Sequence, residues 1–196
     1  MVKVLFCGDV NSEFDILTSR ITSLNSSSHG PFDVVICAGR FFSTTTSSKD
    51  TIFSMPIPTY IMPYDDIDSS FTSIPENIFF MKESGLQTIA GLTVGTSSKG
   101  GYFTPEDLQI LKDPGFRGCD VLITSDWPRE FYHFLDEEEI SSLRTSGPGL
   151  SVGIAQVSEL VVEIKPRYHV TSRYDFFYQR LSVSINNICS SSSLTL

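Results

Sequence analysis

The sequence predicts an α/β domain in which two β-sheets stack face to face and helices cover the outer faces, an α/β/β/α sandwich. Apolar runs at 2–7, 32–38 and 59–62, with a helical pattern between the first two, are typical of parallel βαβ units. Short strands with Gly-containing turns follow at 78–95, which is typical of a meander instead. This change of pattern within one chain of 196 residues predicts two sheets rather than one.

The first helix is expected at 13–24, because apolar residues recur there at the spacing of one helix face. These residues are Phe14, Leu17, Ile21 and Leu24. A Ser-rich stretch ending in Gly30-Pro31 breaks the helical pattern. The run at 32–38 is continuously apolar rather than alternating, as in a strand that is buried on both faces.

Helix starts and stops divide the rest of the chain. Thr104 and Pro105 suit the N-cap and first positions of a helix, and the glycines and proline at 147–149 end another helix. The other expected elements are short strands at 78–81, 86–90 and 92–95, a strand at 119–124, helices at 136–144 and 153–164, and strands at 167–171 and 176–183. We expect one domain at 1–185 and a frayed Ser-rich tail at 186–196.

The composition excludes some functions. Hydrophobic residues make up 40% of the chain and aromatic residues 12%, which is ample for a packed core. The apolar runs are too short to cross a bilayer, and the start lacks the cleavage region of a signal peptide, so we expect no membrane partner. A net charge of −9 disfavours non-specific binding to nucleic acid, because that affinity comes mostly from lysine and arginine.

The four cysteines are Cys7, Cys37, Cys119 and Cys189. No two of them form a C-x-x-C pair, and the first three lie in or beside apolar strand patterns. We therefore expect buried free thiols, which suits a reducing intracellular compartment, and neither a zinc site nor a disulfide framework.

Loops at the carboxyl ends of parallel strands are where α/β folds carry their sites. In this sequence each such loop has a polar or charged residue just beyond an apolar strand. The loops begin at Gly8, Gly39, Met62, Thr124 and Pro166. Their side chains are expected to meet at one edge of the fold.

Several segments between residues 2 and 181 resemble the CwfJ family, whose members are spliceosome-associated relatives of the RNA lariat-debranching enzyme. These segments lie at 7–10, 14–17, 32–42, 58–61, 84–87, 120–128 and 165–169. The Trp127-Pro128 pair and the Lys-Pro-Arg-Tyr-His run at 165–169 make the resemblance fairly specific. It implies a calcineurin-like metallophosphoesterase-type sandwich of two mixed sheets with outer helices. Family members normally continue into C-terminal CwfJ domains, which we expect to be absent here.

The resemblance also identifies the positions that would once have held two metal ions. These vestigial positions are Asp9, Asn11, Arg40, Asp65, Ser125, Arg167 and His169. Asn11 and Ser125 stand where the family pattern has histidines, and Arg40 stands where it has a bridging carboxylate. The complete chain has only three histidines. We therefore expect no metal pair, no cofactor and no catalytic residue.

The favoured function is a non-catalytic interaction module that acts in the nucleus in pre-mRNA splicing and lariat debranching. The resemblance implies that its partners are the lariat-debranching enzyme and spliceosomal proteins. Asp9, Arg40, Arg167 and His169 are then expected to use their polar groups in salt bridges or hydrogen bonds with one another.

A divergent phosphodiesterase is one alternative, with a single metal held by Asp9 and His169 and helped by Asp65 or Asp126. An RNA phosphate-binding module is another, with Arg40, Lys165 and Arg167 around one phosphate.

Trp127 follows a strand end directly and is either core packing or an exposed partner anchor.

Overall fold

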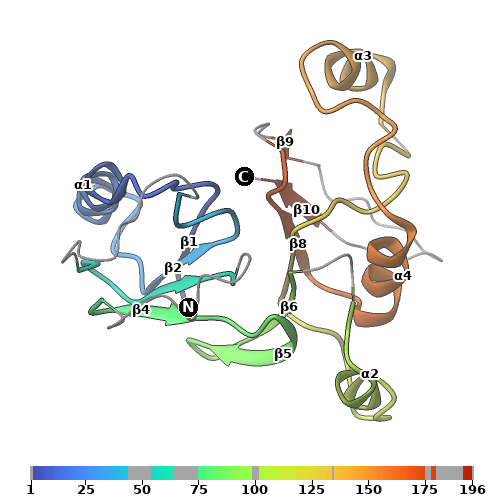
Figure 1. Cartoon of the computed structure of the whole chain (residues 1–196), viewed down its shortest axis with the longest axis horizontal. Helices are drawn as coiled ribbons and strands as arrows, with labels where there is room; N and C mark the ends of the chain where they lie inside the picture. The colour runs from blue at the N-terminus through green and yellow to red at the C-terminus, as the bar shows by residue number, and fades with distance from the viewer. Residues whose placement is uncertain are drawn as a thin grey trace.

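The computed structural model describes residues 2–43, 54–63, 75–98, 102–133, 135–174, 178–179 and 192–195. Within these ranges the chain forms two β-sheets and four helices, which confirms the predicted α/β class and the division into two sheets (Figure 1). No helix in the described ranges is long and apolar enough to cross a bilayer. Asp65, one of the vestigial metal positions, lies outside the described residues.

The N-terminal sheet is entirely parallel. Its strands stand in the order β1 (Val4–Cys7), β2 (Val34–Cys37), β3 (Thr59–Ile61) and β4 (Ile78–Phe80). Helix α1 (Phe14–Asn25) connects the first two strands, as its apolar spacing predicted. The prediction that 78–81 opens a meander was wrong, because β4 pairs in parallel with β3 through Thr59 and Ile78.

The second sheet is mixed. Its order is β5 (Ser84–Ile89), β6 (Leu92–Ser97), β7 (Val121–Thr124), β8 (Tyr168–Thr171), β10 (Ser192–Thr195) and β9 (Tyr178–Gln179). The four inner strands are parallel, and the two edge strands are antiparallel to their neighbours. Four residues of the expected Ser-rich tail at 186–196 thus belong to this sheet.

Three helices lie between β6 and β8 in the chain: α2 (Pro105–Leu111), α3 (Glu137–Thr145) and α4 (Ala155–Ile164). The side chain of Thr104 caps α2 by accepting from the Asp107 amide, as the sequence predicted. Helix α4 begins two residues later than expected. The reason is that Gly153 has φ +98° and the next residue is still extended.

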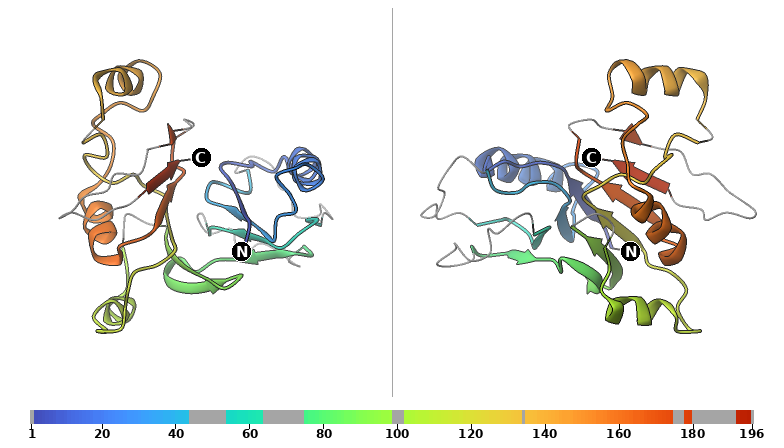
Figure 2. Two further views of the ribbon diagram at one scale, coloured as in Figure 1. Left: turned by 180° about the vertical axis from the view of Figure 1, so that it is seen from behind. Right: turned by 45° about the vertical axis from the view of Figure 1, so that its right-hand side comes forward.

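The core is layered because the central strands bury both faces. On β2, Val34 and Ile36 face the second sheet, whereas Val35 and Cys37 pack against α1. A third apolar cluster lies between the second sheet and the helices α2 and α4. Figure 2 shows α1 outside one sheet and α2 and α4 outside the other.

The loops after β1 and β2 come into close contact at Gly39. A Cβ atom at this position would stand 2.5 Å from the Asp9 backbone nitrogen and 2.6 Å from the Gly8 carbonyl carbon, and closer still to Asp9 Oδ1. Real side chains do not tolerate such distances, so only glycine allows the two loops to pack this way.

We expect Gly39→Ala to lower the free energy of unfolding by about 2–3 kcal/mol, because the inserted methyl group forces the two loops apart. Gly91→Ala is the matched control, since Gly91 has φ +82° and open space around it. Its backbone strain should cost only about 1 kcal/mol. Urea unfolding of both variants measures the difference, and equal losses would contradict the close packing at Gly39.

Candidate functional site

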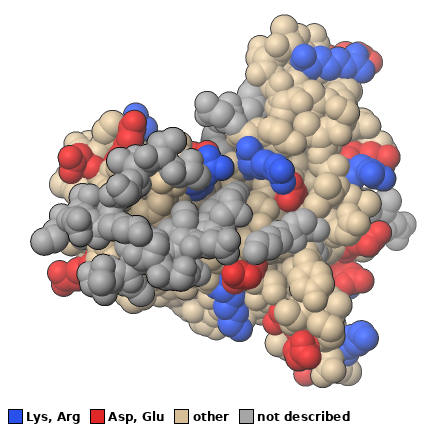
Figure 3. All heavy atoms as spheres, viewed as in Figure 1, with Lys and Arg blue, Asp and Glu red and all other residues tan. Residues whose placement is uncertain are grey.

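The carboxyl ends of the parallel strands of both sheets meet at one edge of the molecule. The Ser172 hydroxyl, just after β8, donates to the carbonyl oxygen of Ala38, just after β2, and so ties the two edges together. We call Asp9, Arg40, Asp126 and Arg173 the strand-end site, since each lies on a loop that leaves a strand at this edge. Figure 3 shows basic side chains gathered at the junction between the two sheets, with an acidic one beside them.

Asp9 is bound to the backbone of the neighbouring loop. Its Oδ1 atom accepts a hydrogen bond of 2.6 Å from the Arg40 amide. In return the Arg40 carbonyl accepts from the amides of Val10, at 2.8 Å, and Asn11, at 3.1 Å. The left-handed backbone of Asn11 (φ 50°) and Ser12 (φ 68°) turns the chain to make these bonds. The expected link between Asp9 and Arg40 therefore exists, through the arginine backbone.

Asp126 lies in the loop after β7 of the second sheet, as Asp9 lies in the loop after β1 of the first. Arg173 donates from Nη1 to Asp126 Oδ1, and this ion pair joins the loops after β7 and β8. The Asp126 side chain is only 13% exposed. Ser125, beside it, donates to the carbonyl oxygen of Ser98 at 2.8 Å. Asp9 and Asp126 thus each already accept a hydrogen bond from the protein itself.

His169 does not face the strand-end site. It lies inside β8 and is fully buried. Its neighbour Val170 points into the core between the sheets, so His169 belongs to the opposite face, as does Leu122, its register partner in the cluster with α4. The sequence placed Asp9 and His169 together as possible ligands of one metal, and the structure separates them.

The hydrogen bonds of His169 define its protonation. The Thr124 hydroxyl has one proton and lies 2.7 Å from the Asp126 carbonyl and 2.8 Å from His169 Nε2. If the hydroxyl donates to the carbonyl, Nε2 must carry the imidazole proton, which leaves Nδ1 as a bare acceptor. Nδ1 is buried and has no hydrogen-bond partner in the structure. Burial lowers the pKa of His169 from 6.5 to about 3, so the ring is neutral.

Arg167 and Lys165 lie at the other end of β8. The Arg167 amide donates to the Cys119 carbonyl before β7 begins, and its guanidinium lies 5.7 Å from the Tyr168 ring centroid. The expectation that a site loop begins at Pro166 was therefore wrong, because residues 165–167 precede β8 and the loop at its carboxyl end begins at Ser172. Arg40 thus follows the carboxyl end of β2, whereas Arg167 lies at the amino end of β8.

Arg173 is the site residue that sequence reasoning missed. It lies two residues after the end of β8, and a charged residue at that position was the available signal. Arg40 is half-buried and lies in the loop after β2. The strand-end site thus has one arginine from each sheet: Arg40, as the sequence suggested, and Arg173 in place of Arg167.

Trp127 is a core residue. It is 2% exposed, and its ring packs edge-on against Phe131 at 4.5 Å and Tyr174 at 5.9 Å between centroids. Burial on this scale leaves no exposed aromatic surface, so Trp127 is not available as a partner anchor. Through its contact with Tyr174, Trp127 packs the loop after β7 against the loop after β8.

The described residues do not fit a metal pair. Two catalytic metals about 3.5–4 Å apart need several carboxylates and imidazoles that point into one cavity. Across the described ranges, no three His, Cys, Asp or Glu side chains come together as a metal-binding group. Asp9 and Asp126 are engaged as above, His169 faces the other way, and Asp65 lies outside the described residues.

The buried neutral His169 predicts a pH-dependent stability. The unfolded chain takes up a proton at this ring below pH 6.5, whereas the folded chain takes it up only near pH 3. The free energy of unfolding should therefore fall as pH decreases from 6.5 toward 3, by up to about 1.4 kcal/mol per pH unit. Urea unfolding at several pH values measures this slope.

The comparison of two variants isolates the contribution of His169 to this slope. His169→Leu should flatten the pH dependence, while His133→Ala, at an exposed histidine, should keep it. An unchanged slope in His169→Leu would show that other groups cause the acid sensitivity.

Comparison with known proteins gives relatives under two names. The chain is 31% identical over 207 residues to CWF19-like protein 1 of Homo sapiens and 32% identical over 190 residues to a CWF19-like protein 1 homolog of Caenorhabditis elegans. These matches cover 92% and 85% of this chain but 37% and 34% of the relatives. A zinc finger CCCH domain-containing protein 64 of Arabidopsis thaliana is 28% identical over 214 residues, covering 91% of this chain and 35% of that protein.

No known protein-family profile matches the chain. The chain spans little more than a third of the length of the curated relatives it matches. The similarity extends over almost the whole described fold, including both sheets. The chain therefore belongs to the CwfJ/Cwf19-like family.

Proposed function

We propose that this chain is a non-catalytic domain of the calcineurin-like metallophosphoesterase type that binds partner proteins in pre-mRNA splicing and intron lariat debranching. Its place of action is the nucleus. The relatives named CWF19-like protein 1 support the link to splicing at the level of the family. Because the chain spans 37% of the human relative, the role of the whole protein is part of the proposal.

One observation carries the non-catalytic part of the proposal. The carboxylates of Asp9 and Asp126 are held by an amide and a guanidinium, at the edge where a phosphoesterase would bind its metals. Each contact occupies one carboxylate oxygen that a metal could otherwise bind, and the Arg173 guanidinium places a positive charge beside Asp126 that disfavours a cation there. Those contacts also join neighbouring loops, so the fold itself opposes their loss.

The same contacts support a role in binding. They hold the loops after β1, β2, β7 and β8 in one arrangement, and a fixed surface binds with a smaller loss of conformational entropy than a mobile one. Arg173 is 57% exposed although it is paired with Asp126, so its charge is also accessible to an acidic partner group. The lariat-debranching enzyme and spliceosomal proteins are the partners we propose.

A pull-down tests the proposed partner. We expect the immobilised chain to retain purified lariat-debranching enzyme, with and without lariat RNA. If the strand-end site is the contact surface, Arg173→Glu should weaken retention at least about tenfold, as expected for loss of a charge pair at an interface. Arg117→Glu is the control, since Arg117 is exposed in the turn before β7. No association under either condition would refute the proposed partner.

A metal-dependent phosphodiesterase is the alternative to test in parallel. If the proposal is right, the chain with added Mn²⁺ will hydrolyse a phosphodiester no faster than Asp9→Ala does. Mn²⁺ should also leave the midpoint of thermal unfolding unchanged, because a metal that binds only the folded state would raise it. Mn²⁺-dependent turnover that Asp9→Ala abolishes would establish the enzyme instead. Binding of a lariat RNA that Arg40→Glu abolishes would favour a phosphate-binding module.

A further inference from the structure

Two cysteines stand side by side on neighbouring strands. Cys7 of β1 and Cys37 of β2 are register partners, and their Sγ atoms lie 2.9 Å apart. Adjacent strands are about 4.8 Å apart, which lies within the range of Cα separations that a disulfide spans. Forming the bond requires the sulfur atoms to approach to about 2.05 Å, a small change for two side chains already in contact.

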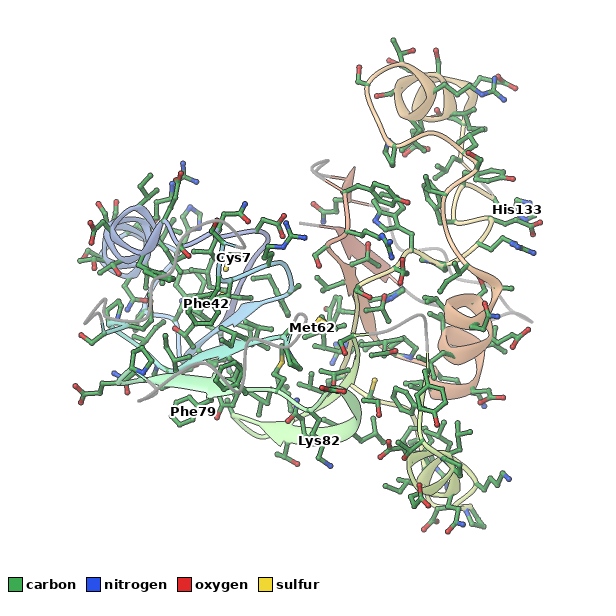
Figure 4. The ribbon with its side chains drawn as sticks, viewed as in Figure 1. Cys7, Phe42, Met62, Phe79, Lys82 and His133 are labelled. Atoms are coloured by element: carbon green, nitrogen blue, oxygen red, sulfur yellow. The ribbon has the colours of Figure 1, made fainter. Side chains whose placement is uncertain are left out.

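The two thiols differ in their access to solvent. Cys37 is fully buried in the cluster between the N-terminal sheet and α1. Cys7 is half-buried and lines a cavity of about 490 Å³ between β1 and α1, together with Asp9, Arg20 and Tyr174. Figure 4 shows Cys7 on the side of the sheet that faces α1. A small oxidant therefore reaches Cys7 first.

We propose that Cys7 and Cys37 are a redox-modification site at which a peroxide converts two thiols reversibly into a cross-strand disulfide. The inference concerns a site that the proposed function does not use, and it stands without that function.

The chemistry proceeds in two balanced steps. The Cys7 thiolate attacks one peroxide oxygen and forms a sulfenic acid, and the other oxygen leaves as water after protonation. The Cys37 sulfur then attacks the sulfenic sulfur, the S–S bond forms, and the second oxygen leaves as water. The two thiols lose two electrons and two protons in total, and hydrogen peroxide becomes two molecules of water.

Burial raises the pKa of the Cys37 thiol, and contact with Cys7 raises it further. Cys37 is thus protonated at neutral pH, so it does not make the first attack on the oxidant, and in the second step it must lose its proton before it attacks. The second step should accelerate as pH rises, since the thiolate is the attacking species.

The position of the pair gives oxidation a structural consequence. Cys7 directly precedes the loop that carries Asp9, and Cys37 precedes the loop that carries Gly39 and Arg40. A covalent bond at this point would fix the bases of both loops of the N-terminal sheet at the strand-end site. Oxidation would thereby change the same edge of the molecule that the Asp9 hydrogen bond organises.

Cys119 provides a matched comparison within the chain. It is buried, and its Sγ atom donates to the Val121 carbonyl at 3.3 Å. Burial raises its pKa to about 12, and it has no thiol neighbour among the described cysteines. Peroxide should therefore leave Cys119 reduced.

The test is peptide mapping after mild treatment of the folded chain with hydrogen peroxide, in a Cys189→Ser background. Trypsin cleaves after Lys3, Arg20 and Arg40, so the two cysteines fall in separate peptides. We expect these peptides to be joined, with a loss of two hydrogen atoms from the intact mass. Dithiothreitol should reverse both changes.

Three variants complete the experiment. Cys119→Ser should oxidise like the parent, and Cys7→Ser should not lose mass. Cys37→Ser should stop at the sulfenic acid, which dimedone traps on Cys7. Unlinked peptides from oxidised parent protein that is still folded by circular dichroism would overturn the proposal, as would a disulfide formed only between two chains. The parent alone therefore decides the outcome even if a variant fails to fold.

Discussion

The hydrogen bond from the Arg40 amide to the Asp9 carboxylate is the contact on which the strand-end site depends. It joins the loops after β1 and β2 over the short distance that only glycine at position 39 permits. The two amides that donate back to the Arg40 carbonyl complete a closed set of bonds between the loops. A carboxylate with this role holds the backbone of the neighbouring loop in place, because one of its oxygens accepts a hydrogen bond from that loop.

The position of this edge relative to the second sheet follows from β2. Its side chains alternate between the two apolar clusters, so the strand is buried on both faces and cannot shift without exposing a core. Ser172, which donates to the Ala38 carbonyl, then sets the loop after β8 against the end of β2. Packing therefore brings Arg173 and Asp126 to the same edge as Asp9.

The sequence predicted the strands and helices well where periodicity or capping was strong, as at α1 and Thr104. The prediction failed where the place of a strand in a sheet depended on which other strand it pairs with. The three residues of β4 have no pattern that names a partner strand, and only the fold assigns them to β3. His169 shows the same limit, because a strand reverses side-chain direction at every residue. The prediction placed Arg167 in a loop at the carboxyl end of a strand. In the structure Arg167 precedes β8, and Arg173 is the arginine that follows this strand.

The arginines explain how such a scaffold stays stable under the proposed function. In a metal-binding relative of this fold, cations would balance the carboxylates at the strand ends, and loss of the metal would leave like charges at close quarters. Here an arginine side chain balances Asp126 and a backbone amide satisfies Asp9. Both partners are part of the chain, so neither contact requires a bound metal. A surface that must present one constant shape to a partner protein needs this independence.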